Sequence, residues 1–100
     1  MTFLANNPPT GLGALAAVPA CSANGTALGS PPSGTIGVRL YLPAGASVSF
    51  TVAATPPAAP PSAVFTVAAT AVGPNWDEAL SAGQMIYVTA SAGAPLFRWQ

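Results

Sequence analysis

Apolar and polar side chains alternate most clearly between residues 35 and 54. In the first stretch, the apolar side chains stand at every second position: Ile36, Val38, Leu40 and Leu42. This spacing is typical of a half-buried β-strand, and it places Arg39 and Tyr41 together on the opposite face. A turn sequence follows at residues 43–45, and alternation resumes over residues 48–54. The pattern therefore predicts a hairpin made of these two strands.

A proline-rich segment, TPPAAPPS, occupies residues 55–62. Prolines lack the backbone donor of a central strand and favour the polyproline II conformation. At about 3.1 Å per residue the segment would span roughly 20–25 Å, so we expect it to cross from one sheet to another or across the end of a barrel.

The sequence FTVAAT occurs at residues 50–55 and again at residues 65–70. Two equivalent strands in facing sheets would explain this repeat, although so Ala-rich a chain can also produce it by composition alone. Strand periodicity predicts that four of these side chains are buried in one core, with Ser49 and Thr51 facing outward. The four are Phe50, Val52, Phe65 and Val67.

The C-terminal quarter predicts a helical turn and two strands. Asn75 followed three residues later by Glu78 resembles a capping box, so we expect one or two helical turns over residues 75–82. Residues 84–91 alternate again as a strand. Residues 96–100 form a last short strand, with Phe97 and Trp99 on one face.

Residues 1–34 contain many Pro and Gly residues and few large apolar ones. Asn24-Gly25 is a tight-turn signal, and residues 14–18 fit either a short strand or a single helical turn. Because ordering a backbone residue costs about 1–2 kcal/mol, this stretch needs contacts that it cannot supply itself. We therefore expect an extended N-terminal arm that is ordered by another chain, followed by a β-domain over residues 35–100.

Strand signals recur with turn residues between them, and the chain is the size of a single domain. The sequence accordingly predicts an all-β fold: a small β-sandwich or jelly-roll-like domain, with a small barrel as the other arrangement of such strands. The extended arm and the short helical turn near residues 75–82 complete the predicted fold.

Charge is scarce, at 4% of the residues against about 25% in average domains. There is no Lys and no His, so the clustered cations that bind nucleic acid or an anionic membrane are missing. No apolar run is long enough for a membrane-spanning helix, and residues 12–20 lack the basic start of a signal peptide. A neutral surface suits a subunit that is covered by partners; the alternative is a monomer solvated by its Ser, Thr and Asn residues.

The side chains that catalysis uses are largely absent. Without His or Lys, no serine has an activating base. Asp77 and Glu78 are adjacent, which suits helix capping better than paired acid–base work. Cys21 is the single cysteine, so it supports neither an intramolecular disulfide nor a structural zinc site. The sequence predicts no enzyme activity, no metal and no cofactor.

The large aromatic side chains can be interpreted in two ways. They could form a sugar-stacking platform, but in a small protein they more often act as core anchors or interface hot spots. We predict interface positions among the large apolar, aromatic and basic residues: Phe3, Leu4, Leu12, Arg39, Tyr41, Trp76, Arg98 and Trp99.

The short Ala/Gly/Pro-rich chain, its scarcity of charge and its strand-forming end SAGQMIYVTASAGAPLFRWQ resemble the head decoration or cement proteins of tailed bacteriophages. The resemblance implies a homo-oligomer bound to a major capsid protein on a virion assembled in the host cytoplasm. On this view the chain bridges neighbouring capsid subunits and binds neither nucleic acid nor membrane. Two alternatives are a receptor- or carbohydrate-binding module of a phage tail tip or cell surface, and an internal tail subunit.

Overall fold

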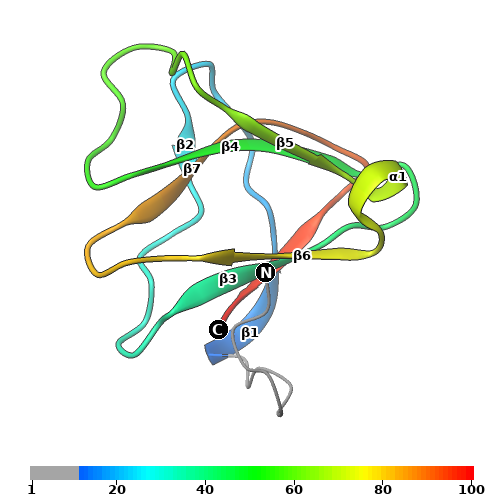
Figure 1. Cartoon of the computed structure of the whole chain (residues 1–100), viewed down its shortest axis with the longest axis horizontal. Coiled ribbons are helices and arrows are strands. Elements are labelled where there is room, and N and C mark those ends of the chain that lie inside the picture. The colour runs from blue at the N-terminus through cyan, green and yellow to red at the C-terminus, as the bar shows by residue number, and fades with distance from the viewer. Residues whose placement is uncertain (1–11) are drawn as a thin grey trace.

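A computed structural model describes residues 12–100 and shows a sandwich of two antiparallel sheets (Figure 1). One short helix, α1 (Ala69–Val72), lies between two of the strands in sequence. The strands are β1 (Leu12–Ala17), β2 (Thr26–Ala27), β3 (Gly37–Tyr41), β4 (Ser47–Ala53), β5 (Phe65–Ala68), β6 (Asn75–Ala79), β7 (Met85–Ala92) and β8 (Leu96–Trp99).

The strand order is that of an eight-stranded jelly roll. One sheet has the order β1-β8-β3-β6 and the other β2-β7-β4-β5. The nested pairs β1 with β8, β2 with β7, β3 with β6 and β4 with β5 are all antiparallel. Such nesting arises when one long hairpin is folded over onto itself, which is the jelly-roll arrangement. The prediction of an all-β, jelly-roll-like sandwich is confirmed.

The core lies between the sheets, as the alternating sequence pattern predicts. Val38 and Leu40 of β3 have no exposed surface, while Ile36, just before the strand, is 48% exposed. On β8, the rings of Phe97 and Trp99 meet edge to face with centroids 5.5 Å apart. The largest fully buried side chains are Phe50, Leu40, Ile86, Val38, Val48 and Val88.

The predicted hairpin of residues 35–54 is wrong. Both strands exist, but β3 belongs to one sheet and β4 to the other. The turn between them, in which the Ala46 N–H donates to the Pro43 carbonyl, carries the chain across the sandwich. A hairpin within one sheet and a crossing between two sheets have the same sequence pattern, namely two strands with a two-residue period and a turn between them. The pattern cannot distinguish them, because pairing partners are chosen by contacts between residues that are distant in the chain.

The proline-rich segment is also placed differently from the prediction. β4 and β5 are neighbours in one sheet, so residues 54–64 form a long hairpin loop and do not cross between sheets. The repeated FTVAAT segments therefore lie in one sheet but meet only at their first residues, with Phe50 opposite Phe65, because β4 and β5 are antiparallel. Phe50 is fully buried, but Phe65 is 65% exposed because β5 is the edge strand.

The other positions of the repeat follow the prediction in part. Val67 is buried and Val52 is half-buried against the core. Ser49 lies on the outer face, where its hydroxyl oxygen is 2.9 Å from that of Thr66. The prediction of a common core therefore fails at Phe65 alone.

The predicted helix at residues 75–82 is wrong. Residues 75–79 are strand β6, which pairs with β3, and the short helix lies earlier, at α1. Asn75 and Glu78 fit the spacing of a capping box, yet the pairing of Asp77 with Arg39 across the sheet outweighs that local preference.

The described part of the predicted arm is integrated in both sheets. β1 pairs with β8, and β2 pairs with β7. The turn predicted at Asn24-Gly25 is present: Gly25 has a φ of 108° and its N–H donates to the Ser22 carbonyl. Residues 12–17 and 26–27 therefore belong to the sheets of their own chain, in contrast to the predicted free arm. Phe3 and Leu4 lie outside the described residues.

Candidate functional site

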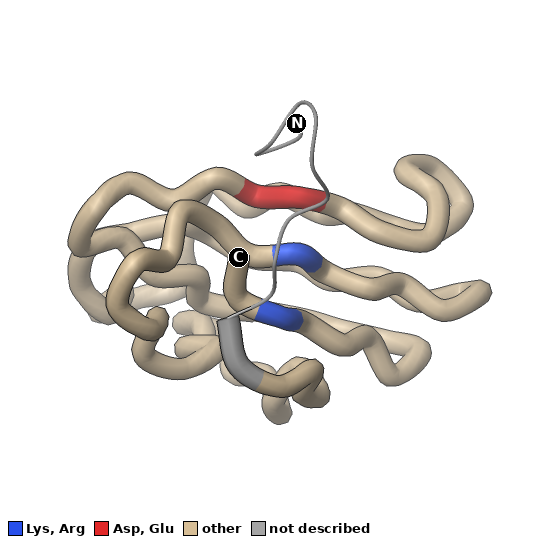
Figure 2. Tube along the Cα trace, turned by 90° about the horizontal axis from the view of Figure 1, so that it is seen from below, with Lys and Arg blue, Asp and Glu red and all other residues tan. Residues whose placement is uncertain are grey.

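The charged residues of the described region lie on three neighbouring strands of one sheet (Figure 2). In register across β8, β3 and β6 stand Arg98, Arg39 and Asp77. Arg39 donates from Nε and Nη2 to the two carboxylate oxygens of Asp77, at 2.5 and 2.9 Å. This hydrogen bonding raises the pKa of Arg39 above its usual value. A two-pronged pair of this kind fixes β6 against β3.

The Glu78 carboxylate has a different partner from that of Asp77, on the other face of the sheet. It stands opposite Val38 and therefore faces the inner side of the sandwich, as does Trp76. The indole Nε1 of Trp76 donates to Glu78 Oε1 at 3.0 Å, and the Trp76 ring packs against the core. Asp77 and Glu78 thus point to opposite faces of the sheet. They do not converge as a catalytic pair, and among residues 12–100 no three metal-ligating side chains gather.

The aromatic side chains proposed for stacking are mostly interior. Trp99 is 8% exposed and Tyr87 is 3% exposed, while Tyr41 and Trp76 are half-buried. Tyr41 lies on the outer face with Arg39, because the residues between and beside them point inward. The one strongly exposed aromatic ring in the described region is Phe65, at 65%.

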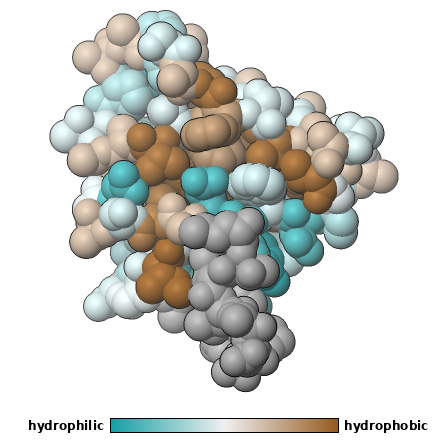
Figure 3. All heavy atoms as spheres, viewed as in Figure 1, coloured by the Kyte–Doolittle hydropathy of each residue, from teal (hydrophilic) through white to brown (hydrophobic). Residues whose placement is uncertain are grey.

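Apolar side chains reach the surface mainly at one end of the sandwich. This neutral end is where β3, β5 and β7 begin and β6 and β8 stop; its loops are residues 29–36, 54–64 and 80–84. Ile36, Val64 and Phe65 are exposed there by 48%, 39% and 65%. None of these loops contains a charged residue. Figure 3 shows separate hydrophobic patches at the surface, with residues of intermediate or hydrophilic character between them.

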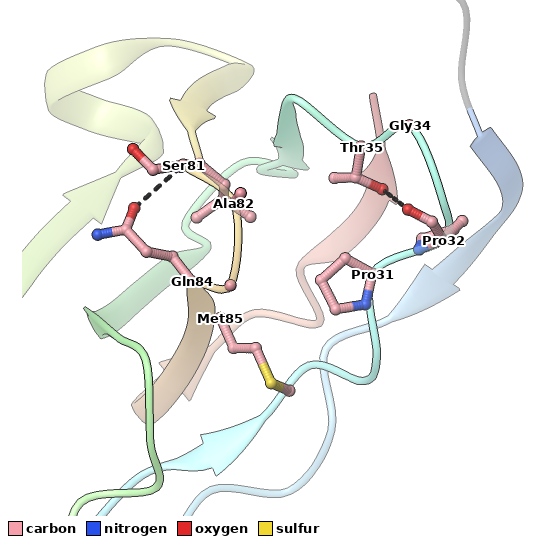
Figure 4. Close-up of a pocket in the computed structure, with 10 residues that line it drawn as sticks. Pro31, Pro32, Gly34, Thr35, Ser81, Ala82, Gln84 and Met85 are labelled. Carbon is pink, nitrogen blue, oxygen red and sulfur yellow. Dashed lines mark hydrogen bonds between the residues drawn. The ribbon is translucent and has the colours of Figure 1, made fainter.

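A pocket of about 380 Å³ opens at the neutral end, between the loop before β3 and the turn from β6 to β7 (Figure 4). Gln84 Oε1 accepts the Ser81 N–H at 3.0 Å, and the Thr35 hydroxyl donates to the Pro32 carbonyl at 2.6 Å. Each of the two segments that line the pocket is thus held by a hydrogen bond within itself. The lining is Pro31, Pro32, Gly34, Thr35, Leu80, Ser81, Ala82, Gly83, Gln84 and Met85.

The walls of the pocket are apolar or neutral. The ring of Pro31 and the thioether of Met85 project into the space between the two segments (Figure 4). A volume of this size lies at the lower end of the range of small-molecule sites. With no charged and no aromatic residue in its lining, the pocket suits an apolar side chain better than an ionic ligand or a sugar ring.

The predicted interface residues do not form one site. Arg39, Tyr41 and Arg98 share the outer face of the β1-β8-β3-β6 sheet. Leu12 begins the edge strand β1, whereas Trp76 and Trp99 take the alternative role of core anchors.

Sequence reasoning did not identify the neutral end as a site. It expected Ile36 and Phe65 to point inward, and it had no account of Val64. The dense prolines at residues 31–32 and 55–62 did indicate loops. Nothing in their local pattern indicated that the two loops lie at the same end of the fold.

Comparison with known proteins returned no match to a family model, a curated protein or a solved structure. Within residues 12–100, no helix has the length and hydropathy needed to cross a membrane.

Proposed function

We propose that this chain is a non-enzymatic structural subunit that docks onto a larger assembly through its neutral end, as a decoration or cement protein of a virus capsid. The observation that carries the proposal is the grouping of Ile36, Val64 and Phe65 at one end whose loops contain no charged side chain. Exposed apolar surface without nearby charge is typical of interaction sites.

The rest of the described surface supports the same assignment. Asp77 and Glu78 are both engaged by neighbouring side chains of the fold, so they contribute little free charge for solvation. A surface with so little charge favours association. The proline-rich loops of the neutral end also lose less conformational freedom on binding than flexible loops would, which favours their use as contact surfaces.

Fold analogy is compatible with the proposal but does not decide it. Jelly rolls are common in viral capsid domains and also in lectins, and a fold does not specify a function. Sugar binding is the weaker candidate, because Trp99 and Tyr87 lie in the interior and the pocket has no aromatic lining. Because the described part of the arm belongs to the fold's own sheets, it adds no support to the proposal.

The test is binding to particles. Purified protein is mixed with particles of the virus whose genome encodes it, after bound copies have been stripped, and the mixture is sedimented through a density gradient. We expect the chain to cosediment in a fixed ratio to the major capsid protein and to raise the temperature at which the particles release their nucleic acid.

Two variants localise the contact. Ile36→Ser and Leu15→Ser each remove a side chain that is 48% exposed, but only Ile36 lies at the neutral end. Binding should weaken at least tenfold for Ile36→Ser and stay within about twofold for Leu15→Ser. Equal losses would refute docking through this end, and a chain absent from native particles and unable to rebind them would refute the capsid role.

A further inference from the structure

We propose that the open edge of β5 pairs with the same edge of a second copy of this chain, in an antiparallel register centred on Thr66. The pairing joins two four-stranded sheets into one continuous sheet across the dimer. It uses the backbone of β5 rather than Ile36 or the pocket, so it stands or falls independently of the capsid role.

The backbone of β5 has one hydrogen-bonded side and one open side. The N–H of Ala69 donates to the Ala46 carbonyl at 3.0 Å, which continues the register of β4 and β5 by one pair. Hydrogen-bonding residues alternate along an antiparallel edge strand, so Phe65 and Val67 also direct their backbone groups to β4. Thr66 and Ala68 then direct theirs to the open side, where residues 12–100 supply no further strand.

The β5 edge lacks the features that protect the other edges. Native edge strands are protected by charge, bulges, prolines or very short length. Among the other edge strands of the described region, β6 carries Asp77 and Glu78, β1 has an irregular register between Leu12 and Ala16, and β2 has two residues. In contrast, β5 reads FTVA, is regularly paired with β4, and lies in a stretch without charge over residues 40–76.

The position of α1 selects the register. Figure 1 shows β5 running from the proline-rich loop directly into α1, which begins at Ala69, so a new ladder ends at Ala68. Centring it on Thr66 uses residues 64–68 of both copies and forms about six backbone hydrogen bonds. Centring it on Val67 would use only residues 66–68.

The side chains of this register are self-complementary. Val64 and Phe65, which are 39% and 65% exposed, stand opposite Ala68 and Val67 of the second copy. Every cross-strand pair is therefore uncharged, and the apolar side chains meet apolar ones, which stabilises paired strands.

A second copy is favoured over a foreign strand because the contact is the same from both sides. Such a two-fold contact closes after two copies and leaves no further β5 edge open. A five-residue ladder buries less than the roughly 1,200–2,000 Å² of a stable interface. We therefore expect a dimer that forms at high protein concentration, with a dissociation constant on the order of 100 µM.

Amide hydrogen exchange of the full chain tests which backbone groups are used. The ¹⁵N-labelled protein is compared at about 20 µM and about 1 mM, and sedimentation equilibrium measures its mass over the same range. Exchange at Thr66 and Ala68 should slow at least twofold at the higher concentration, whereas Val67 should exchange slowly at both. A protein that stays monomeric, or a dimer in which Thr66 and Ala68 exchange at unchanged rates, would overturn the proposal.

Mixed samples test the register. Chains without ¹⁵N carry a nitroxide at Ser62→Cys in a Cys21→Ser background and are mixed with ¹⁵N-labelled chains that carry no nitroxide. The proposed register places residue 62 opposite residue 70, so peaks should weaken at Ala69 and Thr70. A loss centred on Ala63 would mean parallel pairing, and a loss confined to other strands would mean another interface; either result contradicts the proposal.

Substitutions on the edge provide matched controls. Thr66→Lys places two like charges opposite each other and should weaken dimerisation at least tenfold. Thr66→Val removes the same hydroxyl contact with Ser49 without adding charge, and should stay within about threefold of wild type. Leu15→Lys, on the edge strand β1, and Ile36→Ser should change dimerisation less than twofold. Unchanged dispersion of the amide spectrum shows that each variant is folded, and equal losses for Thr66→Lys and Leu15→Lys would show that β5 is not the interface.

Discussion

The paired phenylalanines of the repeated segments provide a sharp test of the described fold. Phe50 and Phe65 are register partners in β4 and β5, with ring centroids 6.0 Å apart, but one is fully buried and the other 65% exposed. Phe50→Ala should lower the free energy of unfolding by about 3–5 kcal/mol, as for other core aromatics.

The expected cost of Phe65→Ala is smaller and has two parts. About one third of the side chain is buried, which corresponds to about 0.5–1 kcal/mol when full burial of such a side chain is worth about 1.5–3 kcal/mol. Its ring contact with Phe50 adds about 0.5–1.5 kcal/mol. The total is therefore about 1–2.5 kcal/mol, below the value for Phe50→Ala.

Urea unfolding followed by tryptophan fluorescence measures both variants and their double mutant. The double mutant should cost less than the sum of the single variants by about the ring-contact energy, because that contact can be lost only once. Costs of similar size at both positions would mean that Phe65 is buried and that β5 is not the edge strand. The same Phe65→Ala protein should also bind capsids more weakly if the neutral end is the docking surface.

Two further predictions concern the turns at Gly45 and Gly93 and the ion pair of Arg39 with Asp77. An added Cβ at Gly93 (φ 74°) would lie 2.6 Å from the Cα of Ala46, whereas one at Gly45 (φ 81°) meets nothing within 4 Å. Gly93→Ala should therefore destabilise the protein by about 1–3 kcal/mol more than Gly45→Ala in thermal unfolding, and equal melting temperatures would contradict the close approach of the two turns. Asp77→Ala should cost about 2–3 kcal/mol in urea unfolding, between the values for exposed and buried pairs, because the Asp77 side chain is only 6% exposed. Adding Arg39→Ala should then cause little further loss, and a strictly additive double mutant would show that the pair does not couple.

Local alternation was sufficient to identify several strands and their inward faces. Val38 and Leu40 on β3, and Phe97 and Trp99 on β8, are buried as their spacing predicts. Such positions are predictable because every residue on the inner face of a two-layer sandwich meets the same apolar environment, whichever strand lies beside it.

Local alternation did not predict which strands pair with each other or which strands lie at the edges of the sheets. The turn before Ala46 carries the chain between sheets, and the long proline-rich loop joins neighbours, because partners in this topology are set by contacts between distant segments. Phe65 has the same sequence context as Phe50, yet its exposure depends on β5 having no further strand beside it. Asn75 has the sequence of a helix cap, but Asp77 two residues later forms an ion pair with Arg39 on β3.

The nested pairing of the strands also constrains how the protein reaches its fold. Leu12 pairs with Trp99, so a growing polypeptide cannot complete the β1-β8 ladder until β8 has emerged from the ribosome. At about 5–20 residues per second, synthesis leaves the early strands waiting for several seconds, and all-β domains dominated by distant pairings then fold over milliseconds to seconds. The earlier strands must meanwhile avoid pairing with other nascent chains, so high expression levels should favour aggregation over folding for this molecule.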